Sequence, residues 1–271
     1  MGMFINTNVG AINANRNLNF NNTQMSKTME KLSSGYRINR AADDAAGLAI
    51  SEKMIYQING LNQAQRNAQD GISFIQTAEG DLTEVHSMLQ RLNTLANQAA
   101  NGTYVQDDRK KIQLEVSELL TEINRITDNS KFNGVNLLNT SATVDFQIGV
   151  SKAETLSVKL SNNGTTALGI NAITVSTVTD AKNAMSAVAK AIDTVSQNRA
   201  QLGAYQNRLE HTINSLGVTA ENLSAANSRI KDADMATEMT AFTKNQILVQ
   251  AGTAMLAQAN SAPQAVLKLL G

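Results

Sequence analysis

The chain has 271 residues, with 23 basic and 23 acidic side chains and a formal net charge of zero. This balance gives no electrostatic case for a nucleic-acid partner or an acidic membrane surface, and it leaves little repulsion between copies of the chain. The absence of Cys excludes disulfides, thiolate metal sites and a Cys nucleophile. With 4% aromatic residues and a single proline, Pro263, the composition favours long helices over a compact aromatic core.

The N-terminal stretch does not have the features of a secretory signal peptide. Asn recurs throughout residues 6–19 and interrupts any continuous apolar run. No window approaches the roughly 18 apolar residues of a membrane span. We therefore expect a protein that, if it leaves the cell, does not use the common route with a cleaved signal peptide.

Apolar residues at helical spacing open the chain and form a stripe with one break in register. The stripe consists of Ile5, Val9, Ile12, Leu18, Met25, Met29 and Leu32. A charged cluster of Arg37, Arg40, Asp43 and Asp44 follows. The two aspartates stand just before Ala45, where they can cap the start of the next helix.

Heptads then continue as far as Asn101-Gly102, a pair that is typical of a helix end. Apolar or small residues occupy positions 61, 68, 75, 82, 89 and 96 and, three residues later, positions 64, 71, 78, 85, 92 and 99. Two such positions in every seven predict a coiled-coil-type seam along one long helix.

A second helix is predicted to start near 106–108. Its expected seam is Val105, Ile112, Leu119 and Ile126, with Val116 and Ile123 between them. Asn133-Gly134 is a turn signal, and the alternating runs TVDFQIGV and TLSVKL predict a β-hairpin. Residues 161–179, which are rich in Asn, Gly, Thr and Ser, are expected to be irregular or weakly extended.

Helix resumes near Asp180 with the clearest repeat in the chain. Its members are Val188, Val195, Leu202, Leu209, Leu216, Leu223 and Ile230. The last helix, about 233–269, carries Ala241, Leu248, Met255, Ala262 and Leu269, and Pro263 is expected to kink it, restart it or mark its final turn. This order predicts a mainly α fold: an elongated, coiled-coil-like helical bundle built from both chain halves, with a small central β-hairpin region near 132–178.

The apolar stripes at the two ends predict self-association. For 61–99, 105–126 and 188–230, ordinary packing within one bundle accounts for the seams. The terminal helices can bury only one seam against each other, and helices with so few contacts are marginal alone. We expect other copies of the chain to complete their burial. The residues expected at this interface are Ile5, Val9, Ile12, Leu18, Met25, Leu32, Leu248, Met255, Leu256, Val266, Leu269 and Leu270.

Several long stretches resemble bacterial flagellin, the subunit of the flagellar filament. They are LSSGYRINRAADDAAGLAISEKM, LANQAANGT and ITDNSKFNGVNLL in the first half and QNRLEHTINSL, SRIKDADMATEM and QILVQAGTAMLAQANSAPQAVLKLLG in the second. The resemblance, over about 1–140 and 180–271, implies an inner-tube domain from 1–43 with 231–271. It implies a long helical domain over 44–230 and no variable outer domains.

The resemblance also implies a function and a set of partners. It implies a structural protein, not an enzyme, that needs no cofactor and polymerises into the extracellular filament that drives swimming. Export would follow the type III route through the central channel without a cleaved signal peptide. The implied partners are an export chaperone at the C-terminal helices, the filament cap and the hook–filament junction proteins. A hook–filament junction protein is the nearest alternative function, and a secreted ligand or adhesin is a more distant one.

The resemblance assigns roles to two groups of residues. Arg37, Arg40, Asp43 and Asp44 match the spoke that joins the inner and outer shells of the filament, although a solvated cluster with a helix cap explains them equally well. Gln90, Arg91, Leu95 and Glu115 match positions that contact Toll-like receptor 5. Asn93-Thr94 departs from the charged pair of many recognised flagellins, and Arg91 serving only the filament interface is the alternative.

No motif for catalysis or metal binding is found. His86 and His211 are isolated in helical patterns, and neither H-E-x-x-H nor a G-x-x-x-x-G-K-[ST] loop occurs. Acidic residues are scattered over helix faces and offer no acid/base pair.

Overall fold

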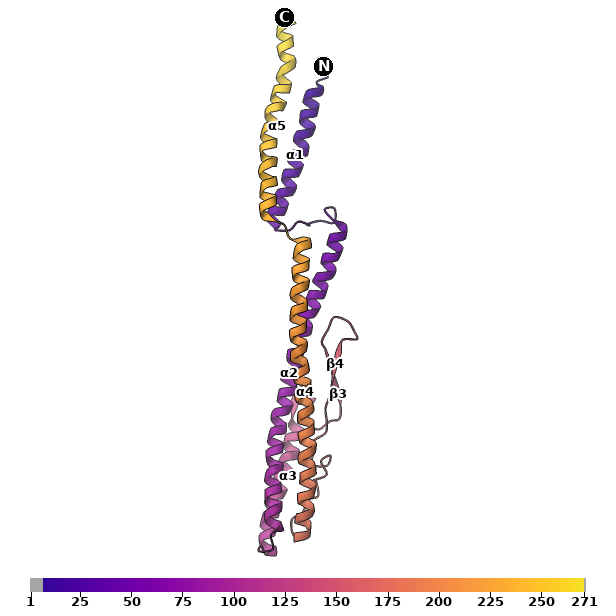
Figure 1. The fold of residues 1–271 in the computed structure, drawn as a ribbon, viewed down its shortest axis with the longest axis vertical. Helices are drawn as coiled ribbons and strands as arrows, with labels where there is room; N and C mark the ends of the chain where they lie inside the picture. Colours follow the sequence, from indigo (N-terminus) through magenta and orange to yellow (C-terminus); the bar gives the residue numbers. More distant parts are fainter. Residues whose placement is uncertain (1–6, 271) are drawn as a thin grey trace. The chain divides into compact units, whose positions relative to one another are not determined.

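The computed structural model describes the backbone of residues 7–270 and the side chains of residues 7–261. Its helices are α1 (Val9–Ser34), α2 (Ala45–Ala100), α3 (Gln106–Asn129), α4 (Val178–Lys231) and α5 (Met235–Leu270). Its strands are β1 (Lys131–Phe132), β2 (Val135–Asn136), β3 (Thr143–Gln147) and β4 (Thr155–Lys159). The predicted mainly α fold, with helices from both chain halves and a small β region between them in the sequence, is confirmed (Figure 1).

The chain divides into two compact units. One is made from the N-terminal stretch up to Tyr56 and the C-terminal stretch from Glu221, and the other from Gln57–Ala220. Both α2 and α4 contribute residues to both units. Helix is interrupted between α1 and α2 and again between α4 and α5. The predicted domain boundaries at 43 and 231 stay a prediction.

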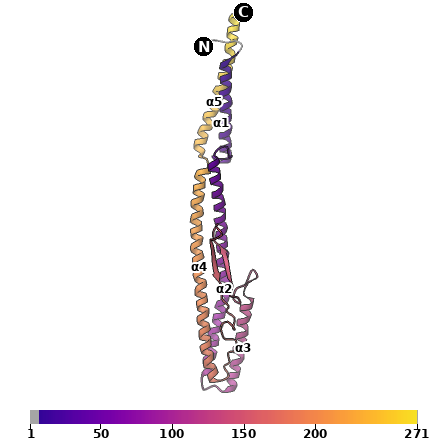
Figure 2. The same cartoon turned by 90° about the vertical axis from the view of Figure 1, so that its right-hand side faces the viewer.

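In the unit of residues 57–220, α2, α3 and α4 lie side by side and share one apolar core (Figure 2). Every position of the α2 seam predicted between 61 and 99 is buried. The α4 repeat is buried at Val188, Val195, Leu202 and Leu209. Its later members, which lie in or near the other unit, are only half-buried.

The long hairpin packs against α2 at two glycines. A Cβ atom placed on Gly60 would lie 2.8 Å from Cγ2 of Val150, and one on Gly71 would lie 3.3 Å from Cδ1 of Phe146. Phe146 also meets Phe74 edge-to-face, with ring centroids 5.5 Å apart. The small residues of α2 therefore give the hairpin room to approach the helix.

Both hairpins form where the sequence predicts a turn or alternation. β3 pairs antiparallel with β4 from Thr143↔Lys159 to Gln147↔Thr155, and the apolar face of β4 is buried. Asn133 and Gly134 both have positive φ and join β1 to β2, as a two-residue hairpin turn requires.

The predicted seam of α3 is wrong at its first position. Val105 precedes the helix and is 63% exposed, whereas Val116, Leu120 and Ile123 are buried. Two overlapping apolar series run along α3: one continues from Val105 every seven residues, and the other consists of Val116, Leu120 and Ile123. The second series is the one buried in the core that α3 shares with α2 and α4. Ile112, Leu119 and Ile126 lie at the edge of the core.

The connection from 161 to 177 is irregular, as predicted, but it contributes to the core. Leu168, Ile170 and Val175 are buried. Gln113 of α3 accepts a hydrogen bond from Val175 N at 2.7 Å, and Asn124 accepts one from Thr165 Oγ1 at 2.8 Å. These amide side chains satisfy backbone and hydroxyl groups that would otherwise be buried without partners. Elsewhere, α5 continues past Pro263 to Leu270.

Candidate functional site

The terminal helices α1 and α5 form an antiparallel pair (Figure 1). Near one end, Asn8 Nδ2 donates to Ala259 O at 2.7 Å while its Oδ1 accepts from Ala11 N and caps α1. Near the other end, Lys31 Nζ lies 3.2 Å from Glu238 Oε1. Between them, a Cβ on Gly252 would lie 3.2 Å from Leu18 Cδ1, so glycine permits close packing there.

Part of the predicted interface set faces the partner helix within the same chain. Leu18, Met25 and Leu32 of α1 and Leu256 of α5 are half-buried. Thr28 is the one buried residue of α1 among those described. A single pair of helices therefore covers only the inner side of each stripe.

The outer sides of the pair expose a second set of apolar residues, the outer apolar stripe. Its members are Val9, Ile12 and Phe20 of α1 and Ile247, Leu248 and Met255 of α5. All except Leu248, at 38%, are between 59% and 65% exposed. At about 3.6 residues per turn, Val9 points away from Leu18, and Ile247 points away from Leu256.

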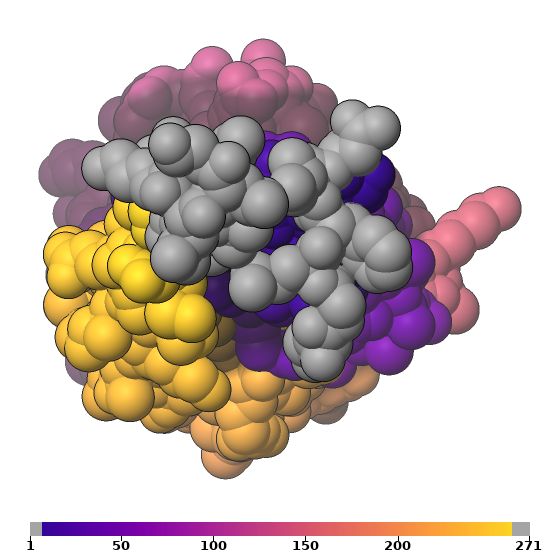
Figure 3. All heavy atoms as spheres, turned by 90° about the horizontal axis from the view of Figure 1, so that it is seen from above, coloured from indigo at the N-terminus to yellow at the C-terminus, as the bar shows by residue number. Residues whose placement is uncertain are grey.

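Sequence reasoning finds four of these six residues and misses Phe20 and Ile247, which fall outside the heptads. Figure 3 views the pair end-on, with the atoms of α5 in yellow beside those of α1 in indigo. Of the other expected interface residues, Ile5 lies outside the described residues, and so do the side chains of Val266, Leu269 and Leu270.

The charged cluster at 37–44 lies in the connection between α1 and α2. Arg37 Nη2 donates to Ile230 O at 2.5 Å, and Arg37 N donates to Lys231 O at 2.7 Å. Arg40 Nε donates to Glu30 Oε1 at 2.9 Å, in a pair whose arginine side chain is 72% exposed. Arg37 therefore ties this connection to the end of α4, while most of Arg40 faces solvent.

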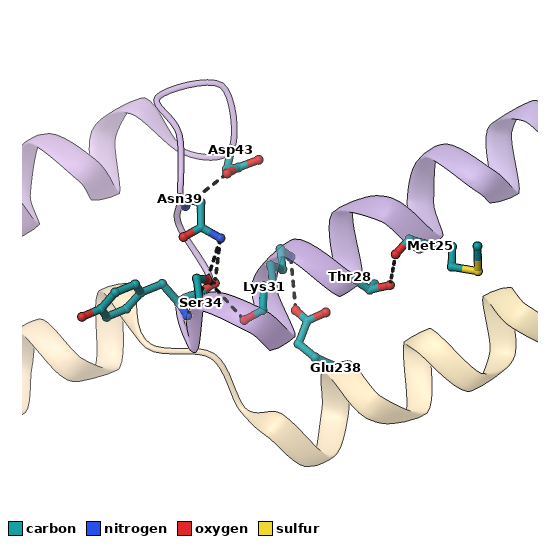
Figure 4. Close-up of polar contacts among 8 residues, drawn as sticks. Met25, Thr28, Lys31, Ser34, Asn39, Asp43 and Glu238 are labelled. Atoms are coloured by element: carbon teal, nitrogen blue, oxygen red, sulfur yellow. Dashed lines mark hydrogen bonds and ion pairs between the residues drawn. The ribbon is translucent and has the colours of Figure 1, made fainter.

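Two aspartates of this cluster organise local backbone. Asp43 Oδ2 accepts from Asn39 N at 3.2 Å (Figure 4) and from Arg40 N at 3.0 Å. These hydrogen bonds, that from Arg40 N first, lower the pKa of the Asp43 carboxyl. Asp44 Oδ1 accepts from Gly47 N at 2.8 Å and caps α2, as predicted. Asp43 instead closes the turn that precedes the cap.

A third aspartate, Asp234, lies in the connection between α4 and α5 and caps the start of α5. Asp234 accepts hydrogen bonds from Thr237 Oγ1 at 3.0 Å and Ala236 N at 3.0 Å, and the hydroxyl, followed by the backbone donors, lowers its pKa. Ala233 N donates to Gly35 O at 2.9 Å, and Lys231 Nζ lies 5.1 Å from the centre of the Tyr36 ring. The two connections are thus hydrogen-bonded to each other, which no sequence pattern signalled.

The four candidate receptor residues differ in their exposure to solvent. Arg91 of α2 reaches Glu115 of α3 through two nitrogens, with Nε and Nη2 both 2.7 Å from Oε1. Gln90 is exposed and contacts His86 Nε2 at 3.0 Å. Leu95 is only 2% exposed and belongs to the core. The fold therefore brings Gln90, Arg91 and Glu115 to the surface and places Leu95 beneath it.

Among the described residues, no group of three or more His, Asp or Glu side chains is arranged to hold a metal ion. Within that same part of the chain, no helix is both long and apolar enough to cross a membrane.

Comparison with known proteins gives consistent matches. The family model of the bacterial flagellin N-terminal helical region matches residues 5–143, and that of the flagellin C-terminal helical region matches residues 185–270. A flagellin of Halalkalibacterium halodurans is 54% identical over 99% of this chain and 100% of its own length. A flagellin of Bacillus subtilis is 50% identical over the same shares of the two chains.

A solved structure agrees with these matches. The crystal structure of Bacillus cereus flagellin has a TM-score of 0.52 and 29% sequence identity, over 60% of this chain and 94% of that one. Together, the helical fold, the paired ends and the matches define a structural subunit of the bacterial flagellum. The chain belongs to the flagellin family, as a short form without outer domains. Members of this family polymerise into the extracellular flagellar filament that serves motility, and the family is one of structural proteins.

Proposed function

We propose that this filament subunit assembles by burying the outer apolar stripe of α1 and α5 against neighbouring copies. The observation that supports this proposal is the exposure of large apolar side chains on the side of each helix that faces away from its partner helix. Expected interface residues whose side chains are not described, Val266, Leu269 and Leu270, continue α5 and belong to the same proposal, as does Ile5 of the N-terminal stretch.

The energies support association through this stripe. Full burial of one large aliphatic or aromatic side chain contributes about 1.5–3 kcal/mol. Association costs about 4–15 kcal/mol in lost translational and rotational freedom. Burial of the six side chains of the stripe against neighbouring copies is therefore of the same order as that cost.

Substitutions on one face of α5 test the proposal. The double variant Ile247→Asn with Met255→Asn should abolish seeded filament formation, measured by electron microscopy and sedimentation. Gln250→Asn changes an exposed polar position of the same helix and is the matched control. Circular dichroism checks that both variants keep their helix content. Normal filaments from the double variant would refute the role of the stripe.

The connections around 35–44 and 232–234 support a second element of the proposal. We propose that Arg37, Arg40, Asp43 and Asp44 form the spoke between an inner domain of 1–43 with 231–271 and a domain of 44–230. Arg37 and Asp44 are engaged within the chain. Arg40 donates its Nε to Glu30, but its side chain stays 72% exposed and is within reach of a neighbouring subunit. Arg40→Gln should weaken filaments at low salt while leaving the stability of the monomer unchanged; equal filament stability in both proteins would exclude this role.

We also propose that the surface formed by Gln90, Arg91 and Glu115 is recognised by Toll-like receptor 5. The two-nitrogen contact between Arg91 and Glu115 holds both side chains in one place, and arginines fixed in this way are common interface anchors. Leu95 is buried in the core beneath this surface. The double variant Arg91→Ala with Glu115→Ala should lose signalling in receptor-bearing cells.

The chain offers a matched control for that experiment. Arg125 and Glu122 of α3 form another exposed arginine–glutamate pair, with Nη2 and Oε1 2.5 Å apart. Arg125→Ala with Glu122→Ala removes the same chemistry from a different place and should leave signalling intact. Equal loss with both pairs, or no loss with the first, would contradict the assignment.

The remaining partners are proposed from the same surfaces. An export chaperone would cover the open groove of α5 lined by Thr240, Thr243, Lys244, Ile247 and Leu248 before assembly. The filament cap and the hook–filament junction proteins would meet subunits at the two ends of the filament, after export through its central channel. Ile247→Asn should reduce chaperone affinity in calorimetry, and unchanged affinity would place the chaperone elsewhere.

A further inference from the structure

We propose that Asn101 is a site of spontaneous deamidation, and that the fold selects it from four Asn-Gly pairs. The pairs are Asn59-Gly60, Asn101-Gly102, Asn133-Gly134 and Asn163-Gly164. An asparagine before glycine is prone to this reaction because glycine has no side chain to shield its backbone nitrogen. The conformation and hydrogen bonds of each pair decide whether that nitrogen can reach the side-chain carbonyl carbon.

The reaction needs only water and solvent base. The Gly102 nitrogen loses its proton to the base and attacks Asn101 Cγ, which forms a C–N bond. The tetrahedral intermediate then breaks the Cγ–Nδ2 bond, and the leaving group takes up a proton and departs as ammonia. Water opens the resulting cyclic imide at either carbonyl. Opening at Cγ gives aspartate, and opening at the main-chain carbonyl gives isoaspartate.

Two of the four pairs are protected because their nitrogens are already engaged. Gly60 lies inside α2, where its N–H belongs to the helical hydrogen-bond ladder. Gly164 N donates to Asn162 Oδ1 at 2.9 Å. The Asn163 side chain is 2% exposed, with its Nδ2 bound to Ser161 O and its Oδ1 bound to Asn198 Nδ2, both at 2.7 Å.

The third pair is held by its hairpin. Asn133 has a φ of 49° and Gly134 a φ of 83°, and the flanking residues Phe132 and Val135 are paired across the strands. The attack of the Gly134 nitrogen on Asn133 Cγ needs freedom to rotate the backbone between the two residues. That rotation would break the two-residue turn, so the hairpin slows the attack.

Asn101 has the features that favour the reaction. It is exposed and directly follows the last residue of α2, and a Cβ on Gly102 would have open space around it. In the described part of the chain, Gly102 N donates no hydrogen bond. Thr103 N donates to Asn101 Oδ1 at 3.3 Å, and this donor stabilises the negative charge that forms on Oδ1 during the attack.

The surroundings of Asn101 also accommodate the product. Arg109 is 9% exposed, and its guanidinium donates to Ala99 O at 2.9 Å and to Asn101 O at 3.1 Å, which are both neutral acceptors. Isoaspartate converts the Asn101 carbonyl into a carboxylate beside this arginine. A hydrogen bond from arginine to a carboxylate is stronger than one to a carbonyl. The connection between α2 and α3 (residues 101–105) should therefore keep its hydrogen bond to Arg109 after isoaspartate has formed.

Time-resolved peptide mapping of the full chain at mildly alkaline pH tests the proposal. Asn101 should convert first, with loss of ammonia and gain of one negative charge, and mass spectrometry should find both aspartate and isoaspartate. In denaturant, all four pairs should convert at similar rates. Gly102→Ala should keep the fold and slow conversion at Asn101 about tenfold, which corresponds to about 1.4 kcal/mol in activation free energy. Faster conversion at another pair in the folded chain, or the same ranking in denaturant, would overturn it.

Discussion

Replacing Gly60 by alanine tests the close approach of the long hairpin to α2. Alanine in a helix interior is favoured over glycine by about 1 kcal/mol. At Gly60, however, the new Cβ would lie 2.8 Å from Val150 Cγ2, and overpacking of this kind costs about 1–3 kcal/mol. We therefore expect Gly60→Ala to lower the free energy of unfolding by up to about 2 kcal/mol.

Truncation of the opposing side chain should reverse this effect. In the background of Val150→Ala, the methyl groups that meet the new Cβ are absent, so Gly60→Ala should stabilise the protein. A double-mutant cycle should then give a coupling energy of about 1–3 kcal/mol. Gly80→Ala is the matched control in the same helix, because no atom lies within 4 Å of its Cβ position. It should stabilise by about 1 kcal/mol.

Urea unfolding followed by far-UV circular dichroism measures all four proteins of the cycle and the control. Additive effects of Gly60→Ala and Val150→Ala would refute the close packing of the hairpin on α2. So would a Gly60→Ala variant that is as stabilised as Gly80→Ala.

Three further predictions concern the core, the caps and the connection between α2 and α3. Leu209→Ala should lower the free energy of unfolding by about 2–5 kcal/mol in urea titrations, since Leu209 is fully buried, and a loss below 1 kcal/mol would contradict its place in the core. Hydrogen bonds lower the folded pKa values of Asp43 and Asp234 below their unfolded values. Their stabilisation should therefore be complete above the usual carboxyl range and should be lost as pH falls through the folded pKa values. Carboxyl titrations by NMR check this sign, and ordinary pKa values would disprove it. Arg109→Met should remove the arginine donor from both Ala99 O and Asn101 O and cost about 1–3 kcal/mol, measured by urea unfolding. Amide exchange at the end of α2 should rise, and unaltered exchange there would argue against a stabilising role for the two Arg109 hydrogen bonds.

Periodicity was a reliable guide where a helix has one apolar face. The α2 seam between 61 and 99 is buried throughout, and the runs TVDFQIGV and TLSVKL pair as a hairpin. Periodicity failed on α3, where two apolar series compete and Val105 proved exposed. It also overlooked the core residues of the 161–177 connection, because the polar composition there hides the buried Leu168, Ile170 and Val175. Amide side chains of α3 bind this connection at Val175 N and Thr165 Oγ1.

Some features of the candidate site were also predictable from the sequence, and others were not. The stripes at the chain ends, the cap at Asp44 and the resemblance to flagellin were readable from the sequence. The split between inner and outer sides of α1 and α5 was not, because Phe20 and Ile247 lie outside the heptads and become significant only beside the partner helix. Likewise, Arg91 and Leu95 lie one turn apart on one face of α2, but Leu95 is buried in the core while Arg91 pairs with Glu115 of α3.

The sequence by itself therefore determined the helices, the hairpins and the family, since these depend on local periodicity, turn residues and long motifs. Only the tertiary structure decided which of several apolar faces is covered and which polar groups meet. Both depend on contacts between residues far apart in the chain, such as Asn8 with Ala259 or Arg37 with Ile230, and no local pattern encodes such contacts.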